Sequence, residues 1–267
     1  MQGLFSFSMK FKIAILAAGK GTRMKSDLPK TLTPVGGKPI LQHLYESILA
    51  SGVTDKPIVV IGPDQPPLCE VFEGVSDYAI QHEQLGTGHA VACAREIVGD
   101  ADTLIVLYGD HPFVSYKTLR RLSELHERAG EVMTIMTTTV PSFDEWRKTY
   151  VHWGRILRDQ EGRIVGIKEY KDASDDEREI REVNPALYCF DTTWLWQHIK
   201  HIQNENANHE YYLTDLIALA VQQGHKIASM NIAPEEAVGI NTPEEREIAE
   251  ELLKKRNAMT DDSLCQD

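Results

Sequence analysis

The chain has 267 residues, of which 42% are hydrophobic and 25% are charged, and its formal net charge is −12 at pH 7. These proportions are typical of one large globular α/β domain or two small ones, and no apolar run approaches the ~20 residues of a membrane span. The acidic balance argues against non-specific binding to nucleic acid or an anionic membrane, because both need clustered Lys and Arg. Four scattered cysteines without a C-x-x-C pair indicate neither a zinc knuckle nor a disulfide framework, so we expect a reducing, cytoplasmic location.

Strand-like and helix-like segments alternate through the first half of the chain. Strands are predicted at 12–18, 56–62, 77–81, 102–110 and 131–140, and helices at 38–52, 86–98 and 116–130. The first strand, "KIAILAA", is apolar on both faces, which is typical of a central parallel strand. This rhythm predicts a Rossmann-like α/β fold with a mostly parallel central sheet flanked by helices.

The rhythm breaks after Pro141. Residues 141–153 lead into two short strands, 154–159 and 163–170, which are separated by "QEG" and predict a hairpin. We expect this block to be a small β insertion over one face. The next strand-like run, 183–191, contains Pro185, which predicts an irregular or edge position.

Helices are then predicted at 192–203, 211–224 and 242–256, the last with a Thr242 cap and Pro243 in its first turn. We expect a single domain over residues 10–257, with disorder in a leader (1–9) and a tail (258–267).

A loop with two glycines follows the first strand directly. Gly19 and Gly21 allow backbone N–H groups to approach a ligand, and Lys20 and Arg23 add positive charge, a combination that suits a phosphate chain. A Walker A loop does not fit because Lys20 precedes Gly21, and a Rossmann fingerprint lacks its third glycine. A nucleotidyltransferase loop and a purely structural tight turn remain. Lys30, after a rigid proline, is a second cation within reach of the same phosphates, or else a solvated surface lysine.

Two further motifs carry polar groups. Asp110 ends the apolar strand of "LYGD" at the carboxyl edge of the sheet, where a single carboxylate suits Mg²⁺; a helix-capping role is the alternative. In "QHEQLGTGHAV", Gln81 precedes Gly86 and Thr87, a pattern that can read the edge of a base or simply begin a helix.

Six motifs in register resemble one enzyme family. The runs are "ILAAGKGTRMKSDLPKTL", "QHEQLGTGHAV", "LYGDHPF", "GRILRDQEGRIVGIKEYKDA", "EVN" and "EYYLTDLIALA". From about Lys12 to about Asn241 they resemble, in the same order, the pyrophosphorylase half of bacterial bifunctional N-acetylglucosamine-1-phosphate uridyltransferase. The resemblance implies the nucleotidyltransferase fold with a small sugar-binding β insertion.

The resemblance also implies a role for each matching residue. UTP would lie against the glycine loop and the base-edge motif, with Tyr108 and Gly109 touching the nucleotide, and the sugar phosphate against the insertion. Arg23, Lys30 and Asp110 would be catalytic, and Asp110 and Asn241 would share one Mg²⁺. The implied nucleotide-binding residues are Leu16, Ala17, Ala18, Gly19, Gly21, Gln81, Gly86, Thr87, Tyr108 and Gly109, and the implied sugar-binding residues are Gly154, Glu169 and Asn184.

Three departures from the family pattern bear on the substrate and on the assembly. The family's Asn-Thr-Gly at the sugar site reads Asn184-Pro185-Ala186 here, which replaces a hydroxyl and a flexible glycine by a ring and a methyl group. The link at 141–153 is longer and bulkier than the family's. Only 26 residues follow Asn241, so we expect no β-helix acetyltransferase half, and a monomer or small homo-oligomer.

The sequence therefore predicts an enzyme that makes UDP-N-acetylglucosamine and pyrophosphate from UTP and N-acetylglucosamine 1-phosphate. A pyrophosphorylase for another sugar 1-phosphate or another nucleotide is the first alternative. A non-catalytic sugar-nucleotide sensor is the second.

Overall fold

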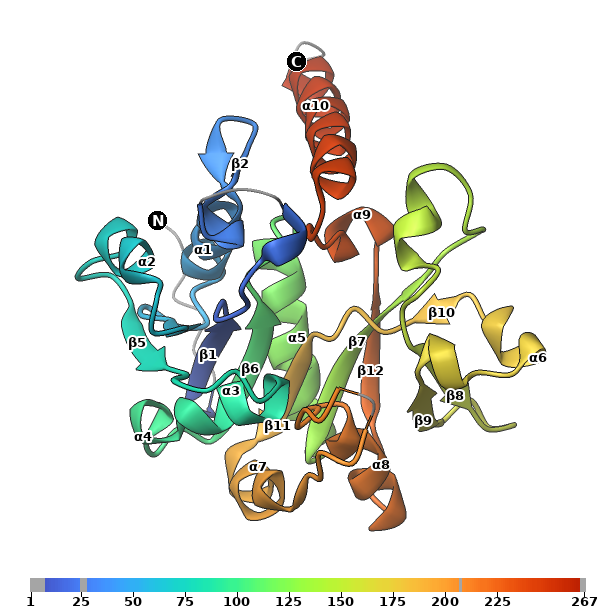
Figure 1. Cartoon of the computed structure of the whole chain (residues 1–267). Helices are drawn as coiled ribbons and strands as arrows, with labels where there is room; N and C mark the ends of the chain where they lie inside the picture. Colours follow the sequence, from blue (N-terminus) through green and yellow to red (C-terminus); the bar gives the residue numbers. More distant parts are fainter. Residues whose placement is uncertain (1–7, 25–27, 207, 265–267) are drawn as a thin grey trace.

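A computed structural model describes residues 8–24, 28–206 and 208–264. Its centre is a β-sheet with helices on both faces (Figure 1). Four strands of the first half are parallel to one another, in the order β5-β4-β1-β6. Their bounds are β1 (Phe11–Leu16), β4 (Ile58–Ile61), β5 (Asp77–Ile80) and β6 (Thr103–Tyr108). The predicted Rossmann-like, mostly parallel sheet is thus confirmed.

The second half of the sheet is mixed. Strand β11 (Tyr188–Asp191) lies antiparallel between β6 and β7 (Met133–Thr139), and β12 (Ala228–Ile232) pairs with β7 in parallel. An edge position for the strand that contains Pro185 is therefore wrong, whereas the irregularity is confirmed. Residues 184–187 interrupt the run as a bulge before β11 begins, and Ala186 has a φ of +60°.

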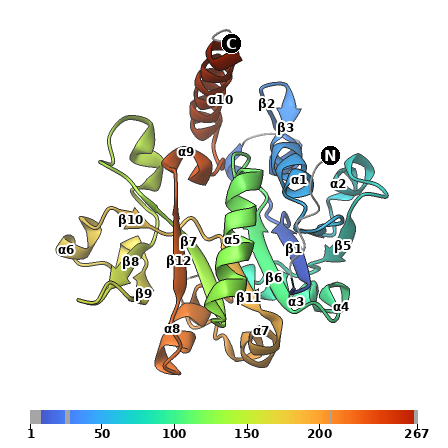
Figure 2. The same cartoon turned by 180° about the vertical axis from the view of Figure 1, so that it is seen from behind.

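Alternate residues of β1 point to opposite helical layers. Ile13 and Ile15 belong to the core cluster that includes α1 (Ile40–Ser51) and α5 (Tyr116–Ala129), whereas Ala14 belongs to the cluster that includes the helices of the other face. The two views from opposite sides show these layers (Figures 1 and 2). The second layer consists of α3 (Thr87–Cys93), α4 (Arg95–Val98), α7 (Thr192–His198) and α8 (Asp215–Gln222).

The remaining elements are short. They are α2 (Pro66–Val71), α6 (Asp175–Arg178), α9 (Pro234–Ala237), the pair β2 (Pro34–Val35) and β3 (Lys38–Pro39), and the 3₁₀ turns η1 (Thr22–Met24), η2 (Lys30–Leu32), η3 (Glu145–Tyr150), η4 (Tyr170–Asp172) and η5 (Ile199–His201).

The insertion extends the sheet instead of covering one of its faces. Strands β8 (Arg155–Arg158) and β9 (Ile164–Lys168) form the predicted hairpin, and β10 (Glu182–Val183) joins β8 to β7. The backbone hydrogen bonds of β10 with β7 and β8 therefore fix the position of the insertion.

Arg155, the first residue of β8, has a fully buried side chain. Its guanidinium group donates to the carbonyl oxygens of Val151, Trp153 and Arg178, and it lies over the rings of Phe143 and Tyr170.

The C-terminal helix is longer than expected. Helix α10 (Pro243–Leu264) begins with the predicted Thr242 cap but continues through residues assigned to a disordered tail. No Gly or Pro follows Pro243, so no residue type that ends a helix interrupts the segment. Residues 1–7 of the predicted leader and 265–267 of the tail lie outside the described residues, while Ser8 and Met9 donate backbone N–H groups to Glu127. Within the described ranges, no helix has both the length and the hydropathy that a membrane span requires.

The burial of Arg155 predicts a large effect on stability. Arg155→Met removes three charge-assisted hydrogen bonds and leaves three carbonyl groups without them, so we expect the free energy of unfolding to fall by about 3 kcal/mol. Urea unfolding at pH 7 measures the change. Arg163→Met is the matched control, because its partners Asp159 and Glu161 lie on the exposed hairpin, and we expect a loss of less than about 1 kcal/mol there. Equal losses in both variants would contradict this account of the insertion.

Candidate active site

The glycine loop leaves the sheet at the carboxyl end of β1. Ala17 still donates its N–H to Val60 of β4, and the chain then turns away through Ala18 and Gly19. Gly21 has a φ of +62°, and a Cβ atom at this position would lie 2.8 Å from the Cβ of Lys30. The sequence therefore needs glycine at 21 for two reasons: the backbone conformation and the close approach of Lys30.

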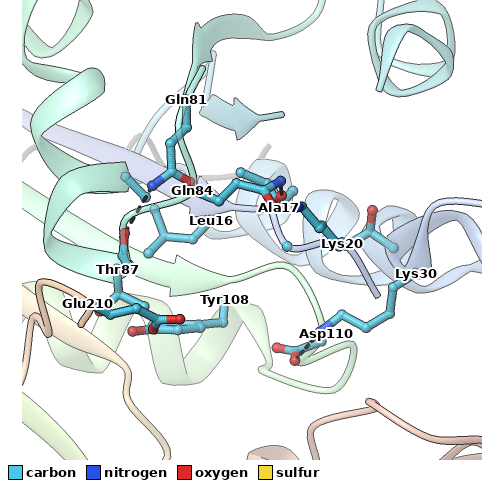
Figure 3. Close-up of a pocket in the computed structure, with 15 residues that line it drawn as sticks. Leu16, Ala17, Lys20, Lys30, Gln81, Gln84, Thr87, Tyr108, Asp110 and Glu210 are labelled. Atoms are coloured by element: carbon cyan, nitrogen blue, oxygen red, sulfur yellow. Dashed lines mark hydrogen bonds and ion pairs between the residues drawn. The ribbon is translucent and has the colours of Figure 1, made fainter. Parts of the chain in front are cut away.

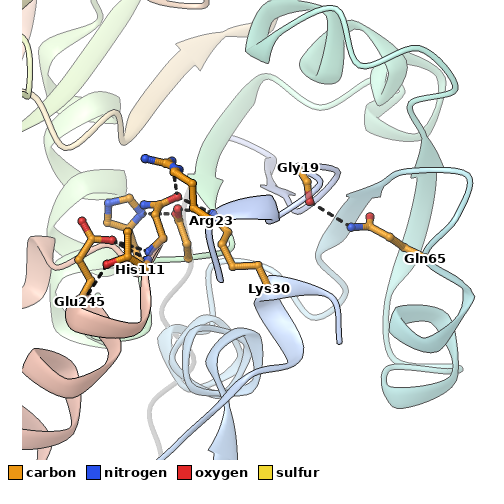
Figure 4. A network of polar contacts seen from close by, with 9 residues as sticks. Gly19, Arg23, Lys30, Gln65, His111 and Glu245 are labelled. Carbon is orange, nitrogen blue, oxygen red and sulfur yellow. Dashed lines mark hydrogen bonds and ion pairs between the residues drawn. The ribbon is translucent and has the colours of Figure 1, made fainter. Parts of the chain in front are cut away.

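Lys30 links the two residues implied as metal ligands. Its Nζ donates to Oδ2 of Asp110 at 2.7 Å and to Oδ1 of Asn241 at 2.9 Å. Arg23 donates to the same Asn241 oxygen at 3.1 Å (Figure 4). The fold therefore brings together four predicted residues from distant parts of the chain: Arg23, Lys30, Asp110 and Asn241.

Asn241 is held from the C-terminal side. Oε2 of Glu245 accepts hydrogen bonds from the backbone N–H groups of Asn241 and Thr242, and the backbone N–H of Glu245 in turn donates to the Thr242 hydroxyl. Ile240 donates its N–H to the carbonyl oxygen of Asp110, which ties this segment to the end of β6. The start of α10 thus fixes one side of the site.

The electrostatics of Asp110 keep it ionised. Burial raises the pKa of its carboxyl group, but Lys30 and His111 outweigh burial and hold the pKa well below its usual value. Oδ1 of Asp110 is buried without a hydrogen bond within the described part of the chain, although Nδ1 of His111 lies 2.9 Å away. A carboxylate with an unsatisfied oxygen beside an amide oxygen is the type of hard-oxygen donor set that suits Mg²⁺.

A cavity of about 530 Å³ opens beside the glycine loop (Figure 3). Ten of the predicted residues line it, namely Leu16, Ala17, Ala18, Gly19, Lys30, Gln81, Gly86, Thr87, Tyr108 and Asp110. Gly21, Arg23 and Gly109 are not among the lining residues. Gly109 donates its N–H to Leu16, and a Cβ atom there would lie only 3.3 Å from the carbonyl oxygen of Leu16. Its contribution is close packing of β6 against β1.

The base-edge motif is locked to the segment before α8. Gly86 has a φ of +109°, and a Cβ atom there would lie 2.7 Å from backbone atoms of Tyr211. Gly88 donates to the Tyr211 carbonyl, Tyr211 donates to Leu85, and Leu213 donates to the Thr87 hydroxyl. Side chains larger than hydrogen are therefore excluded at Gly86.

A second cavity, of about 650 Å³, shares Thr87 and Tyr108 with the first. Glu169 lines this second cavity, and burial together with Asp172 and Asp215 raises the pKa of its carboxyl group. Asn184 donates its N–H to the carbonyl oxygen of Gly154, and Gly154 packs near the Glu169 carboxylate. The three residues implied as sugar ligands thus lie close together, although only Glu169 lines the cavity.

Lys20, which the sequence singles out as a phosphate-binding cation, also lines the first cavity. Several other lining residues were not predicted. They are Thr31, Gln84, Ala90 and Glu210 in the first cavity, and His152, Tyr170, Tyr212 and Thr214 in the second. Gln84 and Glu210 lie within motifs already recognised. Their position in those motifs was the available signal, but nothing in the residue types distinguished them from surface polar residues.

Comparisons with known proteins agree with this geometry. A family model described as the MobA-like NTP transferase domain matches residues 13–203. The chain is 39% identical over 249 residues to the bifunctional protein GlmU of Brevibacillus brevis, and 41% identical over 244 residues to that of Heliobacterium modesticaldum. These alignments cover 92% and 91% of this chain but 52% of each relative, so the chain spans about half the length of those proteins.

The fold has a counterpart among solved structures. A putative glucose-1-phosphate thymidylyltransferase from Bacillus anthracis, solved with sucrose, superimposes with a TM-score of 0.72 over 91% of this chain and 94% of the other. Sequence identity is 19%, so this likeness supports the fold alone. Fold and site together define a nucleotidyltransferase. The chain belongs to the MobA-like NTP transferase domain family and resembles the N-terminal pyrophosphorylase domain of GlmU.

The depressed pKa of Asp110 predicts how stability depends on pH. An ionised Asp110 stabilises the fold above the usual aspartate pKa of about 3.9, and this contribution disappears as pH falls through the lower pKa of the folded state. We expect Asp110→Asn to lower the free energy of unfolding at pH 7, with a difference from the native chain that shrinks below about pH 4. Urea unfolding at several pH values, with a chelator present, measures it.

Asp100→Asn is the control for this series. Asp100 pairs with Lys10 on the open surface, where both side chains are largely exposed, so its replacement should change stability far less. An Asp110→Asn protein as stable as the native chain at pH 7 would show that Lys30 does not stabilise the ionised carboxylate.

Proposed function

We propose that the protein is a sugar-1-phosphate nucleotidyltransferase that forms UDP-N-acetylglucosamine and pyrophosphate from UTP and N-acetylglucosamine 1-phosphate. The observation that carries the proposal is the pair of cavities that meet at Thr87 and Tyr108, with the Lys30–Asp110 pair in the first of them. Two anionic substrates must lie side by side for this reaction, and the two cavities offer adjoining places for them.

In the reaction, an oxygen of the sugar phosphate attacks the α-phosphorus of UTP in line. The new bond joins that oxygen to phosphorus, and the bond to the β-phosphate oxygen breaks, so that pyrophosphate leaves with the electron pair. Lys30 and Arg23 supply positive charge where the phosphates crowd together, and the glycine loop offers backbone N–H groups. The protein acts by positioning the substrates and stabilising charge, and no covalent intermediate on the enzyme is needed.

Mg²⁺ is the cofactor that we propose, because Asp110 and Asn241 present oxygen atoms that suit it. When bound, it would neutralise phosphate charge and bring the two substrates together. Nζ of Lys30 contacts both of these oxygens, so Lys30 must give up at least part of these contacts to act on a phosphate.

Gln81 supports uracil as the base. Its Nε2 donates to the carbonyl oxygen of Gly86 at 3.0 Å, which leaves Oε1 as an acceptor. Uracil offers an N–H donor on its pairing edge, whereas cytosine offers an acceptor nitrogen at that position. The buried Gln81 side chain therefore favours UTP over CTP.

The acceptor sugar has a second candidate, because the chain departs from the family at Asn184-Pro185-Ala186. Oδ1 of Asn184 accepts the Ala186 N–H, and its Nδ2 donates to the hydroxyl of Tyr188. Much of the amide's hydrogen-bonding capacity is therefore used by Ala186 of the bulge and Tyr188 of β11. A pyrophosphorylase for another sugar 1-phosphate, such as glucose 1-phosphate, is the alternative that this observation favours.

Pyrophosphate release tests the proposal. The protein is incubated with Mg²⁺, each of four nucleoside triphosphates, and the 1-phosphates of N-acetylglucosamine, N-acetylgalactosamine, glucose, galactose and glucosamine. We expect turnover with UTP and N-acetylglucosamine 1-phosphate. Asp110→Asn should lower this turnover by roughly 10²-fold or more, because a preorganised charge is lost, while circular dichroism shows a folded chain.

Each other outcome has a defined meaning. Turnover with a different sugar would assign the changed specificity to the 184–186 bulge and the 141–153 segment. If no combination of nucleoside triphosphate and sugar 1-phosphate releases pyrophosphate, although UTP still binds, the proposed enzymatic activity is refuted. That result would support a non-catalytic sugar-nucleotide sensor.

A further inference from the structure

Two glutamine side chains hold consecutive carbonyl groups of the glycine loop. Nε2 of Gln84 donates to the carbonyl oxygen of Ala18 at 2.5 Å, and Nε2 of Gln65 donates to that of Gly19 at 3.3 Å (Figure 4 shows the second contact). Gln84 comes from the base-edge motif, whereas Gln65 directly precedes α2. Neither residue has a role in the reaction proposed above.

The two contacts fix the directions of two backbone donors. In a trans peptide, the C=O of one residue and the N–H of the next point in opposite directions. Holding the Ala18 carbonyl therefore orients the N–H of Gly19, and holding the Gly19 carbonyl orients the N–H of Lys20. Gly19 and Lys20 both line the first cavity, beside the place proposed for the phosphates.

Gln65 is itself held in place. Its Oε1 accepts the N–H of Gly62 at 2.7 Å, and the residue is only 8% exposed. A Cβ atom at Gly62 would lie 3.1 Å from Nε2 of Gln84 and 3.4 Å from both Oε1 of Gln65 and the Ala18 carbonyl oxygen. The end of β4 thus supports both glutamines and the loop at one point. The amide of Gln65 serves both contacts, because its oxygen accepts from Gly62 while its nitrogen donates to Gly19.

We propose that Gln65 and Gln84 are positioning residues that preorganise the glycine loop for the triphosphate of the nucleotide. The inference rests on the proposed function, since it concerns the phosphates of that substrate. We call the two contacts, Gln84 to Ala18 and Gln65 to Gly19, the clamp. Gly19 and Gly21 give the loop conformational freedom, so a loop without the clamp must lose that conformational entropy when the nucleotide binds. With the clamp, the loop is already ordered before the substrate binds.

The test uses Gln84→Met and Gln65→Met, which keep side-chain length but remove the amide. Gln197→Met is the matched control, because Gln197 is exposed on α7 and lines neither cavity. The dissociation constants of UTP and pyrophosphate are measured by calorimetry and that of uridine by NMR titration, with KM for each substrate and the melting temperature.

We expect each clamp variant to bind UTP and pyrophosphate roughly tenfold more weakly, as the loss of one preorganising hydrogen bond allows. Uridine affinity and the KM for the sugar phosphate should stay within about twofold of the native values. Hydrogen exchange of the ligand-free loop peptide should become faster in the clamp variants and remain unchanged in Gln197→Met. A merely structural role would lower the melting temperature without separating UTP from uridine.

Several results would overturn the inference. Native affinity for UTP and pyrophosphate in both clamp variants would do so, and so would an equal loss of UTP and uridine binding. If the buried Gln65→Met variant does not fold, Gln84→Met alone decides, because its side chain is only partly buried. A native chain that binds neither UTP nor pyrophosphate would instead refute the proposed function, and the inference with it.

Discussion

The site depends on one largely buried ammonium group. Lys30 joins Asp110 and Asn241, which come from the end of β6 and the start of α10, and the Lys30 and Asp110 side chains are only 15% and 10% exposed. Charges in such a place interact more strongly than on the surface, but each is costly without its partner. Other features serve this contact: Gly21 leaves room for the Lys30 backbone, and Glu245 holds the backbone that carries Asn241. A chain without Lys30 would leave the buried Asp110 carboxylate without that ammonium group.

The wall between the two cavities is equally constrained. Thr87 and Tyr108 face both cavities, and the Thr87 hydroxyl accepts the N–H of Leu213 from the segment before α8. Because Gly86 approaches the Tyr211 backbone too closely for any side chain, the base-edge motif and this segment must move together. A displacement of the segment before α8 would therefore also displace Gly86 and Thr87, which line the first cavity. The hydrogen bonds of Gly88, Tyr211 and Leu213 join the two segments.

The sequence was most informative where one local rule governs an element. Strand β1 is buried on both faces, and the run of apolar residues predicted it; the Thr242 cap likewise identified the start of α10. Prediction failed where partners distant in sequence determine the position of an element or a side chain. Strand β12 was missed because "ASMNI" mixes polar and apolar residues, and its position comes from pairing with β7. Gln81 and Asp110 were found through motifs, whereas Gln65 has no local pattern that links it to Gly19, 46 residues earlier.

One departure from the family pattern, at Asn184-Pro185-Ala186, lies where the strand run is interrupted. Residues 184–187 bulge between β10 and β11, both of which pair with β7. The N–H of Asn184 donates to Gly154 and the carbonyl oxygen of Leu187 accepts from Met136, so the main chain is held at the two ends of the bulge. Pro185 restricts its own backbone, and Ala186 adopts the left-handed conformation that glycine prefers, which costs about 1 kcal/mol relative to glycine. The contacts of Asn184 with Ala186 and Tyr188 offset this cost within the bulge. Because Asn184 donates its backbone N–H to Gly154, and Gly154 packs near the Glu169 carboxylate, a rigid bulge here holds the main chain beside Glu169, which lines the second cavity.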